Sequence, residues 1–232
     1  MGNNACIMVS HIWKTLRLGI FAGVLIAIGG ALNLCLSSMG QPVWGAVFFS
    51  LGLMCVCLLG ANLFTGKAGY LLEKDRHYAF DVLIMALGNI VGALVVGYLA
   101  ALVFKEWNVP LASKLLYGEG STWYGCLLRA IGAGAFVYLA VECFRKVPSY
   151  PAKLIMVALS IAAMVLLGCN HSVANVFYFA YAQINVPGFD AWNGIFSVLV
   201  AMAGNVLGSL LLYWLQNGIG CLLPKKQMEE EK

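Results

Sequence analysis

Two stretches of the sequence decide the fold, LLGANLFTG at Leu58–Gly66 and LLGCNHSVA at Leu166–Ala174. Both begin LLGxN, and they lie 108 residues apart. Each places Gly and Asn, followed by a hydroxyl-bearing residue, in the middle of an apolar segment. Asn, Ser and Thr bond nearby backbone groups and favour helix ends over helix interiors. The pattern predicts two broken helices, with the breaks near Asn62–Lys67 and Gly168–Ser172.

The surrounding composition indicates a membrane protein. Hydrophobic residues make up 62% of the 232 residues and charged residues only 10%, whereas soluble domains carry about 45–50% apolar and about 25% charged residues. A helix needs roughly 20 apolar residues to cross the hydrocarbon core of a bilayer. Six segments meet this requirement, at about Leu18–Leu36, Pro42–Leu72, Ala79–Phe104, Thr122–Phe144, Leu154–Tyr181 and Ala191–Leu223. We predict an all-α polytopic membrane protein with six transmembrane helices in one membrane domain, residues 1–232.

Charge in the loops predicts the orientation. The first apolar segment is longer than the core of a signal peptide, so we interpret it as the first span. With the N-terminus inside, ten Lys and Arg residues flank the inner ends of the spans, while the outer loops hold only Lys105 and Lys114. This bias predicts that both termini are cytoplasmic. The net charge of +4 follows mostly from it and implies no nucleic-acid partner.

The two halves of the chain resemble each other beyond the two breaks. GNIVGALV at Gly88–Val95 returns 116 residues later as GNVLGSLL at Gly204–Leu211. The pair Leu16-Arg17 returns 112 residues later, with Arg129 in the place of Arg17. Three matches in the same order, at nearly constant spacing, indicate an internal repeat.

Each repeat unit, about 12–104 and 122–223, holds three predicted spans. An odd number of spans turns the second unit upside down, so the repeat is inverted. Inverted repeats place a site near the midplane, where corresponding helices are interrupted, and this predicts a central path lined by both breaks. Glycine pairs at GxxxG spacing favour close helix packing, namely Gly19 with Gly23, Gly88 with Gly92, and Gly204 with Gly208.

Three ionisable side chains lie at membrane depth, where such groups are costly and mark candidate functional sites. His171 is close to mid-membrane in the second break, which favours a role on the path. Lys67 follows the first break and either binds an anion or snorkels toward the inner flank. Arg129 lies near the start of the fourth span, and we expect it to snorkel to the outer face.

No pattern in the sequence indicates an enzyme, a cofactor or a metal site. The eight cysteines lack zinc or haem spacing and are expected to be small buried hydrophobic residues. The three histidines, His11, His77 and His171, form no catalytic constellation. An aquaporin-like pore for small neutral solutes is the nearest alternative. Such a pore would carry Asn-Pro-Ala at both breaks, and no Pro follows either Asn here.

At LLGANLFTG and GCNHSVANVF the chain resembles the formate/nitrite transporter family, and GNIVGALV and GNVLGSLL are similar to that family's third and sixth spans. The resemblance covers essentially the whole chain. It implies an aquaporin-like fold with broken second and fifth helices, assembled as a homopentamer in the lipid bilayer of a bacterial plasma (inner) membrane. It also implies a channel for small monovalent anions of weak acids, most of all formate or nitrite, with hydrosulfide as a further candidate.

The resemblance assigns residues to that path. His171 matches the family's central histidine, Thr65 the threonine that faces it, and Asn175 the asparagine after the histidine. The residues similar to the family's apolar constrictions are Phe49, Leu53, Leu63 and Phe64, together with Met164 at the inner constriction, where an aromatic residue is common.

The chain also departs from the family pattern. Asn62 and Asn170 stand where the family usually has a carboxylate in each repeat. Lys67 replaces a small or polar residue, and Gly134 stands where the fourth span often has Asn. Two lost carboxylates and one added cation make the predicted centre of the pore more positive.

These residues indicate how an anion would cross. A bare anion in an apolar constriction is costly, but a weak acid can take a proton and cross as a neutral molecule. Imidazole has an intrinsic pKa of about 6.5, so we expect His171 to donate a proton or a strong hydrogen bond to the anion. Thr65 and Asn175 would orient the anion or the ring, and the N-terminal ends of the half-helices would attract negative charge.

Overall fold

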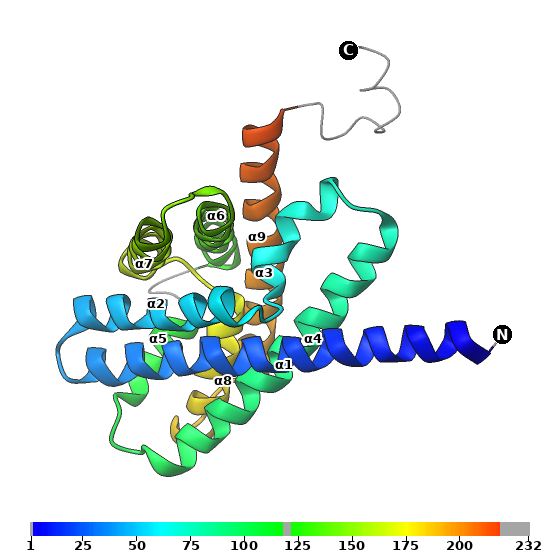
Figure 1. Cartoon of the computed structure of the whole chain (residues 1–232). Helices are drawn as coiled ribbons and strands as arrows, with labels where there is room; N and C mark the ends of the chain where they lie inside the picture. The colour runs from blue at the N-terminus through cyan, green and yellow to red at the C-terminus, as the bar shows by residue number, and fades with distance from the viewer. Residues whose placement is uncertain (1, 118–121, 219–232) are drawn as a thin grey trace.

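A computed structural model describes residues 2–117 and 122–218 of the chain (Figure 1). The regular structure in these two ranges is entirely helical. The elements are α1 (Gly2–Ser38), α2 (Pro42–Leu59), α3 (Phe64–Lys67), the 3-10 helix η1 (Ala68–Leu72), α4 (Arg76–Val103), α5 (Val109–Tyr117), α6 (Trp123–Lys146), α7 (Tyr150–Leu166), α8 (Ser172–Asn185) and α9 (Ala191–Asn217). The predicted end of the sixth span at Leu223 lies outside the described residues, as does the lysine-rich C-terminal end.

Five of the described helices are long and apolar enough to cross a membrane, namely α1, α2, α4, α6 and α9. The apolar helix α7 has 17 residues, and α8 continues it after a break. In the same way α3 and η1 continue α2 after a break. The predicted second and fifth spans are therefore broken helices, which confirms this part of the expected fold.

The two breaks share one backbone geometry. Gly60 and Gly168 both have a φ of 66°, a left-handed conformation that Gly adopts at helix ends without steric cost. The amide after each glycine donates to a carbonyl five residues earlier, at 3.0 Å in both cases. The LLGxN repeat therefore ends two helices in the same way.

The helices α1 and α4 cross closely, and α6 and α9 form the corresponding pair in the second half. A Cβ on Gly92 of α4 would overlap the carbonyl oxygen of Ile20, and a Cβ on Gly208 of α9 would overlap that of Ile131. The glycine spacing thus allows backbone-to-backbone contact, as small residues do in membrane bundles. A Cβ on Gly134 would overlap the carbonyl of Asn205, so in this packing no side chain fits where the family often has Asn.

Helix α5 was not predicted, because its nine residues lie in a segment taken as a loop. Asn108 caps it by accepting from the backbone N–H of Leu111 at 3.0 Å. Its apolar side, with Ala112 and Leu116 fully buried, packs on α8. The N–H of Asn108 donates to the hydroxyl oxygen of Ser38, at the end of α1, at 2.8 Å. We call the side of the bundle that holds α5 and the turn between α1 and α2 the α5 side.

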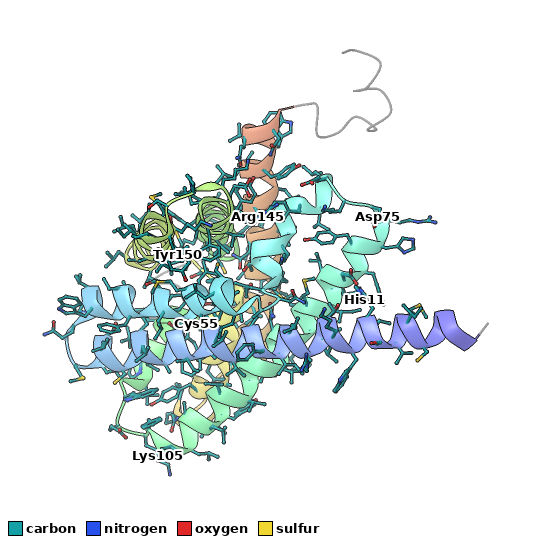
Figure 2. All side chains as sticks on the ribbon, in the orientation of Figure 1. His11, Cys55, Asp75, Lys105, Arg145 and Tyr150 are labelled. Atoms are coloured by element: carbon teal, nitrogen blue, oxygen red, sulfur yellow. The ribbon has the colours of Figure 1, made fainter. Side chains whose placement is uncertain are left out.

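Helix α1 is longer than expected, since it begins at Gly2 rather than near Leu18. Figure 1 shows this first part extending beyond the bundle, and the side chains of Ile7, Met8 and Trp13 are exposed. His11, which Figure 2 labels, has its Nε2 2.9 Å from Asp81 Oδ1 of α4. The extension is thus tied to the bundle at the start of α4.

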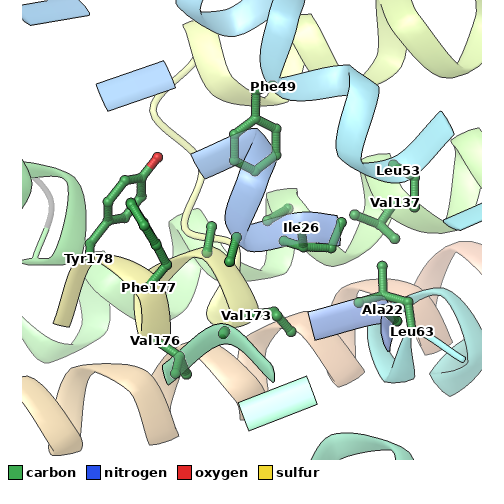
Figure 3. Close-up of a cluster of buried hydrophobic side chains, with 14 of the residues drawn as sticks. Ala22, Ile26, Phe49, Leu53, Leu63, Val137, Val173, Val176, Phe177 and Tyr178 are labelled. Atoms are coloured by element: carbon green, nitrogen blue, oxygen red, sulfur yellow. The ribbon is translucent and has the colours of Figure 1, made fainter. Parts of the chain in front are cut away.

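The buried core gathers around the two breaks. Figure 3 shows Phe49 and Leu53 projecting from α2 into the same apolar cluster as Leu63 and Val173. These four side chains are each at most 3% exposed. The starts of the second half-helices, at Leu63–Thr65 and Asn170–Ser172, are therefore enclosed by protein, whereas the helix ends at Gly60 and Gly168 are exposed.

Candidate functional site

A buried asparagine holds the first break. The side-chain Oδ1 of Asn89 accepts from the backbone N–H of Phe64 at 2.9 Å. Its Nδ2 donates to the carbonyls of Gly19 at 2.7 Å and Asn62 at 2.9 Å. Asn89 is fully buried. These bonds satisfy backbone groups that the interrupted helix leaves without partners, so one side chain of α4 fixes both ends of the break.

The second break is held by an equivalent asparagine. The Oδ1 of Asn205 accepts from the N–H of Ser172 at 2.9 Å and from its hydroxyl at 2.7 Å. Its Nδ2 donates to the carbonyls of Ala130 at 2.8 Å and Asn170 at 2.9 Å. Asn205 is also fully buried. We refer to Asn89 and Asn205, with the backbone groups that they bind, as the two asparagine clamps.

The clamps correct the predicted register of the repeat. The N–H of Asn62 donates to the carbonyl of Leu18, and the N–H of Asn170 donates to the carbonyl of Arg129. The counterpart of Arg129 in the first repeat is therefore Leu18, and the alignment of Arg129 with Arg17 was one residue out. The matching Leu-Arg pairs suggested this alignment. The hydrogen bonds of Asn62 and Asn170 show that the equivalent positions are one residue further along the first span.

His171 and Thr65 meet at the centre, each from its own break. Thr65 Oγ1 lies 3.1 Å from His171 Nε2, and the two residues are 0% and 3% exposed. His171 is the N-cap of α8, where its Nδ1 accepts from the N–H of Ala174 at 3.4 Å. In a neutral ring a nitrogen that accepts carries no proton. The proton is then on Nε2, from which it is donated to Thr65.

A cavity of about 280 Å³ leads from the α5 side to His171. Water occupies about 30 Å³ per molecule in the liquid, so this volume holds several waters or a small hydrated anion. The described residues that line it carry cations and amides but no carboxylate. They include Asn33, Lys114, Arg129, Gly168, Asn170, His171, Asn175 and Tyr178.

The amides at the cavity are held by nearby groups. Asn175 lines the cavity and donates through Nδ2 to the carbonyl of Leu116 in α5 at 3.3 Å. Asn170 donates to the thiol sulfur of Cys126 at 3.3 Å. The structure thus brings Asn170 and Asn175 to one cavity with His171, while Asn62 does not line it.

Lys67 is at the other end of the first break, away from this cavity. It ends α3 and is partly buried, close enough to Arg145 to interact electrostatically. Its ammonium group forms no ion pair with any residue in the described ranges, so the structure shows no contact with the flank formed by Glu73 and Asp75. Its backbone carbonyl accepts from the hydroxyl of Tyr78 at 3.1 Å.

The predicted constriction residues are all buried in one apolar cluster, but only some of them line the cavity. Phe49 and Met164 both line the cavity on the α5 side; that Met164 forms the inner constriction stays a prediction. It is at the end of α7, just before the break, and therefore faces the same cavity as His171. Leu53, Leu63 and Phe64 are at most 2% exposed and do not line the cavity.

Arg129 was expected to snorkel to the outer face, and the structure instead places it in the cavity wall. Its NH1 lies 3.5 Å from the carbonyl oxygen of Gly168, at the second break. The turn of the α7 end toward α6 brings this carbonyl within reach of the guanidinium, which sequence position alone does not indicate.

Sequence reasoning missed the two asparagine clamps. Asn89 and Asn205 stand in the paired stretches GNIVGALV and GNVLGSLL, which were interpreted as a repeat match, a family resemblance and glycine packing motifs, with no role for the Asn. The available signal was the Asn itself, an amide repeated at the same place in two otherwise apolar helices. A buried amide in a membrane helix needs partners, and a neighbouring break supplies them.

Comparison with known proteins identifies relatives along nearly the whole chain. The family model described as "Formate/nitrite transporter" matches residues 4–217. A probable formate transporter from Methanothermobacter thermautotrophicus is 30% identical over 243 residues, which cover 87% of this chain and 88% of that protein. A formate-nitrite transporter from Entamoeba histolytica is 24% identical over 221 residues, and the match covers 87% of this chain but 62% of that relative's length.

A solved structure has the same fold. The structure described as a pentameric formate channel with formate bound matches with a TM-score of 0.72 and 18% sequence identity. The match covers 96% of this chain and 99% of that one. At this identity the likeness supports the arrangement of helices, including the two broken ones.

Proposed function

Because the chain belongs to the formate/nitrite transporter family, whose members are channels and transporters rather than enzymes, we propose that it carries small monovalent anions of weak acids across a membrane. Formate and nitrite are the foremost candidates, and hydrosulfide is a third. The relatives named for formate support this choice of substrate.

One observation carries the proposal, the 3.1 Å contact between Thr65 Oγ1 and His171 Nε2 at the end of the cavity. This contact joins the two breaks. An anion that enters the cavity from the α5 side meets the buried imidazole of His171 there. A buried His is also common as a hydrogen-bonded structural residue. Here its N-cap bond uses only Nδ1, so the Nε2 proton is available to Thr65 or to an anion.

The chemistry follows from the surroundings of the ring. Leu53, Leu63 and Phe64 are buried apolar side chains of the core cluster outside the cavity, and a bare anion among them is strongly disfavoured. A weak acid avoids this cost when it accepts a proton and crosses as a neutral molecule. In the proposed mechanism His171 donates a proton or a strong hydrogen bond to the anion, while Thr65 orients the ring.

The asparagines have supporting roles in this proposal. Asn175 lines the cavity next to His171 and orients the ring or the anion. Asn62 and Asn170 keep the two breaks neutral where a carboxylate would repel an anion. The backbone amides of Phe64 and Ser172 are bound by the clamps, so the half-helices act on the anion mainly through their dipoles.

Lys67 is proposed to act on the opposite side of the apolar residues. It is partly buried at the end of α3 and has no ion-pair partner within the described ranges. A cation there would attract an anion, or hold it as it leaves, without contact with His171. In this scheme Lys67→Ala raises the half-saturation concentration for the anion, and an unchanged value contradicts the role.

Assembly and location are proposed from the family and from charge. A homopentamer is supported by the solved relative described as pentameric, with each protomer in the lipid bilayer of a bacterial plasma membrane. Both termini are proposed to be cytoplasmic, from the Lys and Arg bias. The chain is proposed to form a single membrane domain with repeats of about 12–104 and 122–223, whose last residues lie beyond the described ranges.

The test is flux of formate, nitrite and hydrosulfide into proteoliposomes over a range of pH. His171→Phe removes the whole imidazole function, and we expect loss of uptake with the fold intact. His171→Asn is a matched variant, because Asn is a good N-cap residue but holds no transferable proton. It is expected to keep the thermal stability and lose the uptake. Undiminished formate and nitrite flux in both variants would rule out the role of His171.

A further inference from the structure

Arg129 and Lys114 are charged residues of the cavity lining that the proposed mechanism does not use, and Arg129 lies at the second break. Its guanidinium has five N–H donors, and within the described ranges its one hydrogen bond is the 3.5 Å contact with the carbonyl of Gly168. It forms no ion pair with a described residue, although it is half-buried. The cavity wall therefore contains a fixed positive charge with unused donors.

The fold does not require this side chain. Arg129 contributes its backbone carbonyl to the second break, and Leu18 contributes the same carbonyl to the first. Because Leu18 performs this task with an aliphatic side chain, the guanidinium is an addition specific to the second repeat. It lies at the wall of the cavity that ends at His171, whereas Leu18 does not line that cavity.

The chemistry of the guanidinium favours one shape of anion. Its planar fork matches two oxygens held on one atom, and it binds carboxylates through two parallel hydrogen bonds. A spherical or single-atom anion accepts no such pair. A Lys ammonium in the same place would supply the charge as a point without the fork.

We propose that Arg129 is a specificity-determining residue, which binds planar two-oxygen anions such as formate or nitrite in the cavity and favours them over hydrosulfide. The inference rests on the proposed function, because it concerns the substrate class of that same path. Arg129 holds the anion in the cavity before it reaches His171, and the neighbouring amides of Asn170 and Asn175 complete a wall without described carboxylates.

The test measures the ratio of formate to hydrosulfide uptake in proteoliposomes containing the full chain. Arg129→Lys keeps the charge and removes the fork, so the half-saturation concentration for formate should rise roughly three- to tenfold while that for hydrosulfide stays unchanged. Arg129→Leu copies the first repeat and should lower the uptake ratio further. Lys105→Gln is the control, because Lys105 lies at the periphery of the bundle (Figure 2) and does not line the cavity.

A second measurement does not depend on transport. Sodium formate should raise the melting temperature of the wild-type protein above its value in sodium chloride of equal ionic strength, since a ligand stabilises the state that binds it. This difference should disappear in Arg129→Leu and shrink in Arg129→Lys.

The outcomes separate this inference from the proposed function. If the wild type transports formate and both Arg129 variants keep its uptake ratio and its formate-dependent melting shift, the specificity role is overturned and the proposed function stands. If Arg129→Leu lowers the melting temperature in every salt but leaves the ratio unchanged, Arg129 serves only to bind Gly168. Loss of transport in the His171 variants tests the proposed function independently.

Discussion

Removal of the second asparagine clamp should destabilise the protein and disturb its centre. Asn205→Ala deletes four hydrogen bonds, two to the carbonyls of Ala130 and Asn170 and two from the amide and hydroxyl of Ser172. Side-chain hydrogen bonds between membrane helices contribute about 0.6 kcal/mol on average and about 1.7 at most. Four of them amount to roughly 2 to 7 kcal/mol. We expect the lower half of this range, because the break relaxes when it is released.

The assay is thermal unfolding of the purified protein in detergent, followed by the fluorescence of its six tryptophans. For a chain of this length 1 kcal/mol corresponds to about 2–4 °C, so the melting temperature should fall by roughly 5 °C or more. Ser172 adjoins His171, so a shift of the break moves the ring away from Thr65. Anion flux should then fall roughly tenfold or more, as small misplacements of reacting groups are costly.

Two matched variants complete this experiment. Asn89→Ala removes three equivalent bonds from the first break and should lower the melting temperature to a similar extent. Asn217→Ala is the control on α9, because Asn217 is exposed, donates to the carbonyl of Tyr213 in its own helix at 2.8 Å and bonds to no residue of either break. If Asn205→Ala melts within about 2 °C of the control and transports normally, the clamp does not hold the break and the reasoning is refuted.

Three further substitutions test other parts of the structure. Gly208→Ala should prevent folding or leave little protein at its native elution volume, because the new Cβ overlaps a backbone carbonyl of α6. Glu142→Gln should cost only about 1 kcal/mol in thermal unfolding, since the two ion pairs it loses, 2.7 Å to Lys146 and 3.4 Å to Arg145, have partners that are 59% and 56% exposed. Thr65→Val should lower flux about fivefold or more by deleting the bond to His171, and Thr65→Ser should restore most of it.

Each of these has a matched comparison. Gly132→Ala meets only the thiol of Cys169, at 3.0 Å, and should fold. Glu106→Gln, on an exposed loop, should leave the melting temperature unchanged. A Gly208→Ala protein of normal stability, or a Thr65→Val protein with normal flux, would show that the close helix contact or the central hydrogen bond is unimportant.

The breaks were predictable because Gly and Asn occur together in both LLGxN stretches, each within a long apolar segment. Gly60 and Gly168 lie in apolar segments too long for one simple crossing, each followed by Asn, and the structure gives both the same left-handed φ. The asparagine clamps were not predicted, since Asn89 and Asn205 lie 25 or more residues from the breaks that they hold. Sequence periodicity carries no information about which helix approaches which break.

The candidate site was predicted in part for similar reasons. His171 and Thr65 meet as the family resemblance implied, because both are fixed by their position next to a break. The presence of Arg129 and Met164 in one cavity wall was not predicted, since the direction of a side chain near a break depends on how the interrupted helix ends turn. No rule of spacing along the chain determines that turn.

Each asparagine clamp lies within one half of the molecule. Every bond of Asn89 stays within the first three spans, and every bond of Asn205 stays within the last three. Each half therefore supplies the amide that holds its own break, while Ser209 of the second half also donates to the carbonyl of Thr65 at 3.1 Å. The contact between Thr65 and His171 likewise exists only when the halves have docked. The contact between Thr65 and His171 thus depends on how the two halves pack against each other. If they are misaligned, the proposed transport centre is incomplete.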